Sequence, residues 1–234
     1  MRKIEIYSDG ANLAAMLEMN SNPLIAGLTT NPSLMKKAGI TDYRGFCLEV
    51  LKSVKTKPIS FEVFTDHLEE MKKQALEIKT WGPNVYVKIP ITNSEGRSTL
   101  ALIEELSHSG VKLNVTALLS VEQIWGTAQA LKGGAASIVS VFAGRIADTG
   151  RDPVPTMSFA ADLCRSLSSE MKLLWASSRE VYNLIQAEQA GCHIITMPPD
   201  LIQKISMFQK DLKQLSLDTV RTFKADADAA GFQL

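Results

Sequence analysis

The chain has 234 residues, with 25 basic and 25 acidic side chains that give a formal net charge of zero, and 45% of its residues are hydrophobic. This balance excludes a disordered chain and argues against a nucleic-acid binder that depends on phosphate contacts. The three cysteines, Cys47, Cys164 and Cys192, lie far apart without a CxxC pair, so we expect neither a zinc site nor a disulfide framework. We find no apolar run long enough for a membrane span or a secretory signal, and therefore expect a cytoplasmic protein with no membrane partner.

Short β-type segments alternate with helical segments along the chain. Most of the β-type segments are rich in Val, Ile and Leu without strict alternation, as in a parallel sheet buried on both faces. Strands are predicted at 3–8, 23–29, 59–64, 84–90, 111–116, 137–142, 172–177 and 193–198. Apolar spacing predicts helices between them at 43–54, 68–78, 95–108, 120–131, 156–169, 179–190 and 209–230.

Eight such units in a chain of this length predict an α/β fold, a single (β/α)8 TIM barrel. An open doubly wound sheet is the alternative, but no GxGxxG or P-loop motif follows any strand. Because no linker divides the chain, we expect one barrel domain over 1–234, with 209–234 as a C-terminal helix or tail. The apolar residues of that last segment could pack on their own barrel or on a neighbouring subunit, and their spacing does not decide between the two.

Lys88 lies within the apolar run VYVKIP (85–90), where its flanking residues hinder access to water. Burial disfavours the charged form of an amine, and a neutral amine in a barrel mouth can form a Schiff base with a carbonyl substrate. Asp9 and Glu62, on the first and third strands, could supply the acid/base partner that C–C cleavage requires. The alternatives are a buried ion pair for Lys88 and a helix N-cap for Asp9.

Arg145 and Arg179 follow the adjacent sixth and seventh strands, and Ser177 lies beside them. Two guanidinium groups and a hydroxyl in this quarter of a barrel mouth suit an anion, most often phosphate. The alternative is that one arginine pairs with Asp148 or Glu180 at the surface. No His/carboxylate cluster suggests a metal site, which disfavours a metal-dependent aldolase. Further polar or aromatic residues near the carboxyl ends of the strands are Asn31, Asn114, Thr116, Ser140 and Phe142.

Several motifs together resemble the transaldolase family, and the chain's length resembles its small transaldolase/fructose-6-phosphate aldolase branch. The motifs are GLTTNPSL (27–34), VYVKIP (85–90), Asn114-x-Thr116, SVFAGRI (140–146) and WASSRE (175–180). The resemblance covers nearly the whole chain, and the order of the motifs is more specific than any one of them. It implies a class I enzyme that needs no cofactor.

The resemblance also implies a role for each matching residue. Lys88 would form the Schiff base, and Asp9 would act as acid/base at the C4 hydroxyl of the substrate. Glu62 and Thr116 would hold the water that carries protons to and from the Schiff base. The residues expected to bind substrate are Asn31, Asn114 and Ser140 at its hydroxyls, and Arg145, Ser177 and Arg179 at its terminal phosphate.

Three positions favour a transaldolase over an aldolase. The small aldolases of the family typically have Gln at Glu62 and Tyr at Phe142, and they lack Asn114. A phenol could help to protonate the enamine and release free dihydroxyacetone, whereas Phe142 cannot. We therefore expect transfer of a dihydroxyacetone unit from a ketose phosphate, such as fructose 6-phosphate or sedoheptulose 7-phosphate, to an aldose phosphate, as in the pentose phosphate pathway. The alternative is a fructose-6-phosphate aldolase that releases dihydroxyacetone.

Departures from the family pattern lie near the anion clamp. Ser178 replaces a common aromatic residue, and Trp175 is bulky for its position. A sulfonated or otherwise modified ketose is therefore a second alternative substrate, and a non-catalytic sugar-phosphate-binding barrel is the alternative from another class of protein. By resemblance we expect a homo-oligomer, a pentamer or decamer.

Overall fold

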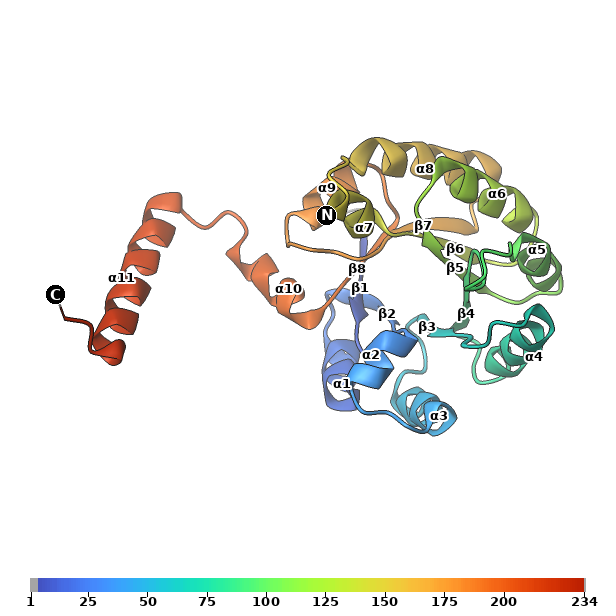
Figure 1. Cartoon of the computed structure of the whole chain (residues 1–234), viewed down its shortest axis with the longest axis horizontal. Helices are drawn as coiled ribbons and strands as arrows, with labels where there is room; N and C mark the ends of the chain where they lie inside the picture. The colour runs from blue at the N-terminus through green and yellow to red at the C-terminus, as the bar shows by residue number, and fades with distance from the viewer. Residues whose placement is uncertain (1–3, 234) are drawn as a thin grey trace. The chain divides into compact units, whose positions relative to one another are not determined.

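Eight strands, built mainly from apolar and β-branched residues, form the wall of a closed barrel in the computed structural model, which describes residues 4–233 (Figure 1). All neighbouring strands are parallel and pair in chain order, and β8 closes on β1. Their bounds are β1 (Glu5–Asp9), β2 (Ile25–Thr29), β3 (Ile59–Glu62), β4 (Val85–Pro90), β5 (Leu113–Leu118), β6 (Ser137–Val141), β7 (Met171–Trp175) and β8 (Ile194–Met197). The predicted TIM barrel is confirmed.

Helices surround this wall and cover its outer face (Figure 1). They are α1 (Leu13–Ser21), α2 (Pro32–Lys37), α3 (Tyr43–Ser53), α4 (Leu68–Lys79), α5 (Leu100–His108), α6 (Val121–Leu131), α7 (Ala143–Asp148), α8 (Val154–Leu167) and α9 (Asn183–Gln189), and the short α10 (Pro199–Gln203) comes after β8. A 3₁₀ turn (Lys204–Met207) and α11 (Leu212–Ala230) follow. The predicted helices do not include α1, α2, α7 and α10, which are short and give little periodic signal.

Side-chain caps fix where several of the helices begin. Asn12 caps α1 by accepting a hydrogen bond from the Ala15 amide, and Asn31 caps α2 through the Leu34 amide. The alternative that Asp9 caps the first helix is therefore wrong, since Asp9 is the last residue of β1 and faces the barrel mouth.

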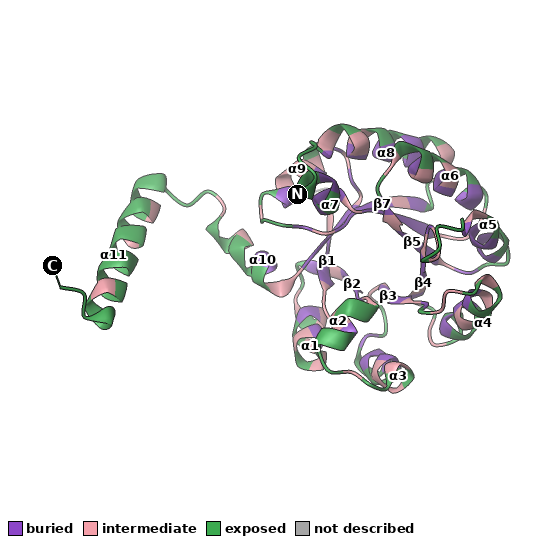
Figure 2. Cartoon of the chain, in the orientation of Figure 1, coloured by how far each residue is buried: buried purple, intermediate pink, exposed green. Residues whose placement is uncertain are grey.

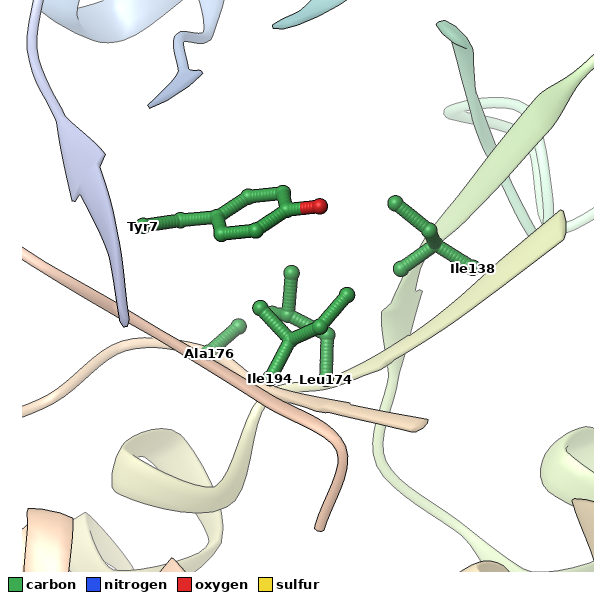
Figure 3. Close-up of a cluster of buried hydrophobic side chains, with 5 residues drawn as sticks. All are labelled: Tyr7, Ile138, Leu174, Ala176 and Ile194. Carbon is green, nitrogen blue, oxygen red and sulfur yellow. The ribbon is translucent and has the colours of Figure 1, made fainter. Parts of the chain in front are cut away.

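The barrel interior below the mouth is filled by Tyr7 and by an apolar cluster from β6, β7 and β8. The Tyr7 ring extends from β1 toward Ile138 on β6, with Leu174 and Ile194 beside it (Figure 3). Gly27 on β2 is required beside this ring, because a Cβ at that position would overlap it. The cluster closes the barrel and thereby gives the mouth a floor.

Buried residues concentrate in the strands and on the inner faces of the helices (Figure 2). The three cysteines are free and buried, and burial raises the pKa of each thiol to about 12. Across residues 4–233, every helix is too short or too polar to cross a membrane.

The chain separates into two compact units, one ending at Ile202 and the other beginning at Gln203. The second unit contains α11, which begins after the Asp211 cap and ends at Gly231 in the left-handed conformation (φ 67°). None of the residues of α11 is buried, and Leu212 and Phe223 are 77% and 67% exposed.

Candidate active site

The carboxyl ends of the strands open into a cavity of about 540 Å³. It is lined by side chains from every strand of the barrel or from the loop that follows it. All the predicted site residues except Arg179 line this cavity, namely Asp9, Asn31, Glu62, Lys88, Asn114, Thr116, Ser140, Phe142, Arg145 and Ser177. Parallel strands bring together residues that are far apart in the sequence, as expected for this fold.

Lys88 is buried at the centre of the site, with a side chain only 9% exposed. Glu62 is its neighbour in the β3–β4 register, and the Lys88 Nζ lies 3.1 Å from Glu62 Oε2. The same nitrogen donates a 3.2 Å hydrogen bond to the carbonyl oxygen of Thr30, just after β2. A buried amine beside a carboxylate can exchange its proton locally, as Schiff-base chemistry requires.

Asp9 is held in the same cavity by one threonine hydroxyl, which a second threonine supports. The Thr29 hydroxyl donates to Asp9 Oδ1 at 2.8 Å and lies 2.6 Å from the hydroxyl of Thr196 on β8. Burial raises the pKa of the Asp9 carboxyl, and the Lys88 charge and the Thr29 hydrogen bond oppose this only in part. A carboxyl with a raised pKa can both accept and donate a proton at a reacting hydroxyl.

A buried chain of hydrogen bonds crosses the barrel beside Lys88. The Asn114 amide donates to the Ser60 hydroxyl at 2.9 Å and accepts from the Ser140 hydroxyl at 2.7 Å. These bonds fix the orientation of the Asn114 amide. Thr116 lines the cavity, and its buried hydroxyl has no hydrogen-bond partner among the described residues, which makes it a candidate to bind a water molecule or a substrate group.

Two non-glycine residues with positive φ shape the rim of the cavity. Ala117 (φ 63°) lies at the register shift between β5 and β6, and Ser177 (φ 63°) follows β7. Gly144 packs directly against the Ser177 backbone, since a Cβ on Gly144 would overlap the Ser177 carbonyl oxygen. Such strained conformations concentrate at functional sites, where surrounding contacts hold them in place.

The two predicted anion-binding arginines lie in different surroundings. The Arg145 guanidinium lies over the Phe142 ring, 5.3 Å from its centroid, at the edge of the cavity. Arg179 does not line the cavity, because its Nε and one Nη donate to the carboxylate of Asp148, at 3.0 Å and 2.5 Å. This pairing was the alternative that the sequence left open.

Comparison with known proteins shows the family of this chain. The profile of the family described as Transaldolase/Fructose-6-phosphate aldolase matches residues 6–234. The chain belongs to this family. A "Probable transaldolase" of Dehalococcoides mccartyi is 34% identical over 202 residues, which cover 86% of this chain and 90% of the relative. Another from Methanococcus vannielii is 33% identical over 226 residues, covering 97% and 98%.

Among solved structures, a 2,3-dimethylmalate lyase superposes with a TM-score of 0.57 at 12% identity, covering 97% of this chain and 95% of that one. At this identity the likeness shows the fold alone. The resemblance to the transaldolase family inferred from the sequence motifs is therefore confirmed by the family profile and by the curated relatives, which are similar over most of their length.

Several residues in this transaldolase-family site were missed by sequence reasoning. Thr196, the penultimate residue of β8, has no charge that would mark it within an apolar strand. Ser60 precedes Glu62 by two residues on β3, so the alternation of a strand could have placed both in the interior. Lys37 lines the cavity from the last turn of α2, a six-residue helix without a periodic signal.

Proposed function

We propose that this chain is a class I transaldolase that moves a dihydroxyacetone unit from a ketose phosphate to an aldose phosphate without a cofactor. The observation that carries the proposal is the buried Lys88 amine, which lies 3.1 Å from the Glu62 carboxylate and shares its cavity with the Asp9–Thr29 pair. Family membership supports sugar phosphates as the substrate class.

The reaction begins at Lys88. Its neutral Nζ attacks the C2 carbonyl of the ketose, and loss of water from the carbinolamine gives the protonated Schiff base. Glu62 and the unpartnered Thr116 hydroxyl hold the water through which protons reach and leave this centre. The Glu62 carboxylate, 3.1 Å from the amine, is close enough to take its proton before attack.

Asp9 then drives cleavage of the C–C bond. Its ionised carboxylate removes the proton of the C4 hydroxyl, the C3–C4 bond breaks, and its electrons pass into the Schiff base as an enamine. The aldose phosphate leaves, and the dihydroxyacetone unit stays on Lys88. An acceptor aldose binds in the same place, and Asp9 returns its proton to the new C4 oxygen as the reverse steps form the product ketose.

Phe142 supports transfer over release. The enamine yields free dihydroxyacetone only after it is protonated at carbon, and Phe142 lines the cavity without a hydroxyl that could provide this proton. Asn31, Asn114 and Ser140 bind the sugar hydroxyls in this proposal. If the chain were an aldolase, fructose 6-phosphate alone would yield free dihydroxyacetone as fast as the substrate is consumed.

A second candidate substrate is a ketose with another anionic tail, such as a sulfonate. The observation that favours it is the Arg179–Asp148 pair, which leaves Arg145 and Ser177 at the cavity to meet the tail. A sulfonate carries one negative charge and needs less compensation than a phosphate dianion. In the phosphate reading, Arg179 exchanges Asp148 for the phosphate when substrate binds.

The experiment that tests the proposal is borohydride trapping. The protein is incubated with fructose 6-phosphate, reduced and weighed intact, alongside Lys88→Ala and the matched control Lys37→Ala, which removes another cavity lysine. We expect an adduct with the mass of reduced dihydroxyacetone in the wild type and in Lys37→Ala, and none in Lys88→Ala. If fructose 6-phosphate and sulfonated and non-phosphorylated ketoses all fail to trap, a non-catalytic binding role replaces the proposal.

We also propose a cytoplasmic homo-oligomer, on the family resemblance and on the exposed apolar residues of α11. Leu212, Val220 and Phe223 are more than half exposed, at 77%, 58% and 67%. Apolar residues of this size on one helix are typical of an interface. Light scattering should give a mass several times 25.6 kDa for the wild type and a smaller one for Phe223→Asp. A monomeric wild type would refute this part of the proposal.

A further inference from the structure

The ladder between β2 and β3 stops early, next to the proposed catalytic pair. These two strands pair only at Leu28↔Ile59 and Thr29↔Ser60, because α2 begins directly after Thr30 and its cap Asn31. Successive residues of a parallel strand turn their backbone groups to opposite neighbours. Since the Val63 amide bonds to the Lys88 carbonyl on β4, the backbone groups of Glu62 face the side where β2 has ended.

Tyr43, the first residue of α3, takes the place of the missing strand. Its hydroxyl accepts a 2.9 Å hydrogen bond from the Glu62 amide and donates a 2.6 Å hydrogen bond to the Glu62 carbonyl oxygen. One side chain therefore satisfies both backbone groups of Glu62 that a longer β2 would have bonded. The same break leaves the Thr30 carbonyl free to accept from Lys88.

The Tyr43 ring is itself fixed. It packs against Phe64 and Trp81, with ring centroids 4.9 Å and 6.4 Å apart. Asp42 caps α3 immediately before it. Burial raises the pKa of the Tyr43 phenol far above its ordinary value, so the hydroxyl keeps the proton that it donates. The titratable neighbours are Cys47 on the same helix and the Glu62 carboxyl with its partner Lys88.

We propose that Tyr43 is a positioning residue for the reaction: by holding the Glu62 backbone, it places the Glu62 carboxylate against Lys88 and the water that serves the Schiff base. This inference rests on the proposed function and adds a residue that touches neither substrate nor the reacting atoms. The backbone position matters because Glu62 is the last residue of β3, with no β2 partner to hold it. A displacement of about 1 Å at a reacting group can cost up to 100-fold in rate.

The test is a double-mutant cycle on transfer activity with Tyr43→Phe and Glu62→Gln. Tyr43→Phe keeps the ring and removes the hydroxyl, and we expect kcat to fall about tenfold with KM within about twofold, because the residues that bind the sugar are not moved. In the Glu62→Gln background, Tyr43→Phe should change kcat by less than about twofold, since the group it positions is already lost. Equal losses in both backgrounds would overturn the inference.

The matched control is Val50→Ala, a buried residue of α3 whose substitution weakens the packing of the helix but leaves the Tyr43 hydroxyl in place. Each variant is assayed at the same interval below its own Tm. The inference requires Val50→Ala to retain the wild-type kcat, and a loss equal to that of Tyr43→Phe would assign the effect to general destabilisation. If Tyr43→Phe does not fold, Phe64→Leu loosens the ring packing and should lower kcat in the wild type but not in Glu62→Gln.

The trapping experiment distinguishes a failure of the positioning role of Tyr43 from a failure of the proposed function. If the wild type forms the borohydride adduct and Tyr43→Phe turns over at the wild-type rate, the positioning role is overturned and the proposed function stands. If the wild type forms no adduct with any of the ketoses, the proposed function is overturned, and the role of Tyr43 falls with it.

Discussion

Lys88 Nζ and Glu62 Oε2 lie 3.1 Å apart, in an ion pair whose side chains are 9% and 15% exposed. Adjacent positions in the β3–β4 register bring the two groups together. Removing one partner of a buried pair leaves the other charge uncompensated, which costs more than the pair contributes when both are present.

A cycle of Lys88→Met, Glu62→Gln and the double variant should therefore show strong coupling in stability. Because each single substitution leaves a buried polar or charged group without its partner, we expect each to lower the free energy of unfolding by up to about 3–5 kcal/mol. The double variant should be less destabilised than the sum. Urea unfolding measures all four proteins, and additive losses would show that the pair is not electrostatically coupled.

This pair also shows how far the sequence alone reaches. Lys88 is conspicuous in VYVKIP because a lysine within an apolar strand is uncommon. Glu62 is conspicuous for the same reason, as a charged residue at the end of the apolar strand β3. Barrel geometry then places both at the mouth without any knowledge of side-chain contacts. The predicted ends of all eight strands lie within two residues of the observed ends, since each strand is a short apolar run with turns on both sides.

The sequence alone could not predict the side-chain contacts of the site. Whether Arg179 turns to the cavity or to Asp148 depends on rotamers and on a neighbour 31 residues away. The Tyr43–Glu62 contact spans 19 residues between a helix and a strand end, and no local pattern marks it. Helices as short as α2 and α7, of six residues each, give no periodic signal from which their bounds could be predicted.

Gly144→Ala should damage the rim of the site. The new Cβ would overlap the Ser177 carbonyl oxygen, and both atoms belong to backbone segments that cannot turn aside as a flexible side chain can. We expect a loss of about 1–3 kcal/mol in unfolding free energy and a raised KM, because Ser177 is displaced from the cavity. Gly10→Ala is the control, since a Cβ there meets nothing within 4 Å. A Gly144→Ala protein with the Tm and KM of the Gly10→Ala protein would contradict the packing described for these two loops.

Asp148→Asn should strengthen binding of an anionic donor. Removing the carboxylate charge frees the Arg179 guanidinium for the substrate tail, so KM for fructose 6-phosphate should fall severalfold while KM for a non-phosphorylated ketose stays the same. The control is Asp162→Asn, which removes the carboxylate from another exposed arginine pair, that of Arg165. Because both pairs are exposed, we expect little change in stability from either. An unchanged KM for the phosphorylated ketose would place Arg179 outside the substrate site.

Asp9→Asn should raise the stability of the protein at pH 7 and abolish its transfer activity. Since burial raises the pKa of Asp9 in the folded protein, the folded state binds its proton more tightly than the unfolded state does. The stability of the wild type therefore falls as pH rises from the unfolded pKa of about 4 through the raised folded value, and the penalty persists above it.

Asparagine carries no charge at any pH and can still accept the Thr29 hydrogen bond. We expect Asp9→Asn to have the higher Tm at pH 7, with the difference shrinking toward pH 4, and to lose transfer activity because C4 proton exchange is lost. Thermal melts at the two pH values measure this, and a wild type more stable than Asp9→Asn at pH 7 would mean that the Lys88 charge outweighs the burial of the carboxylate.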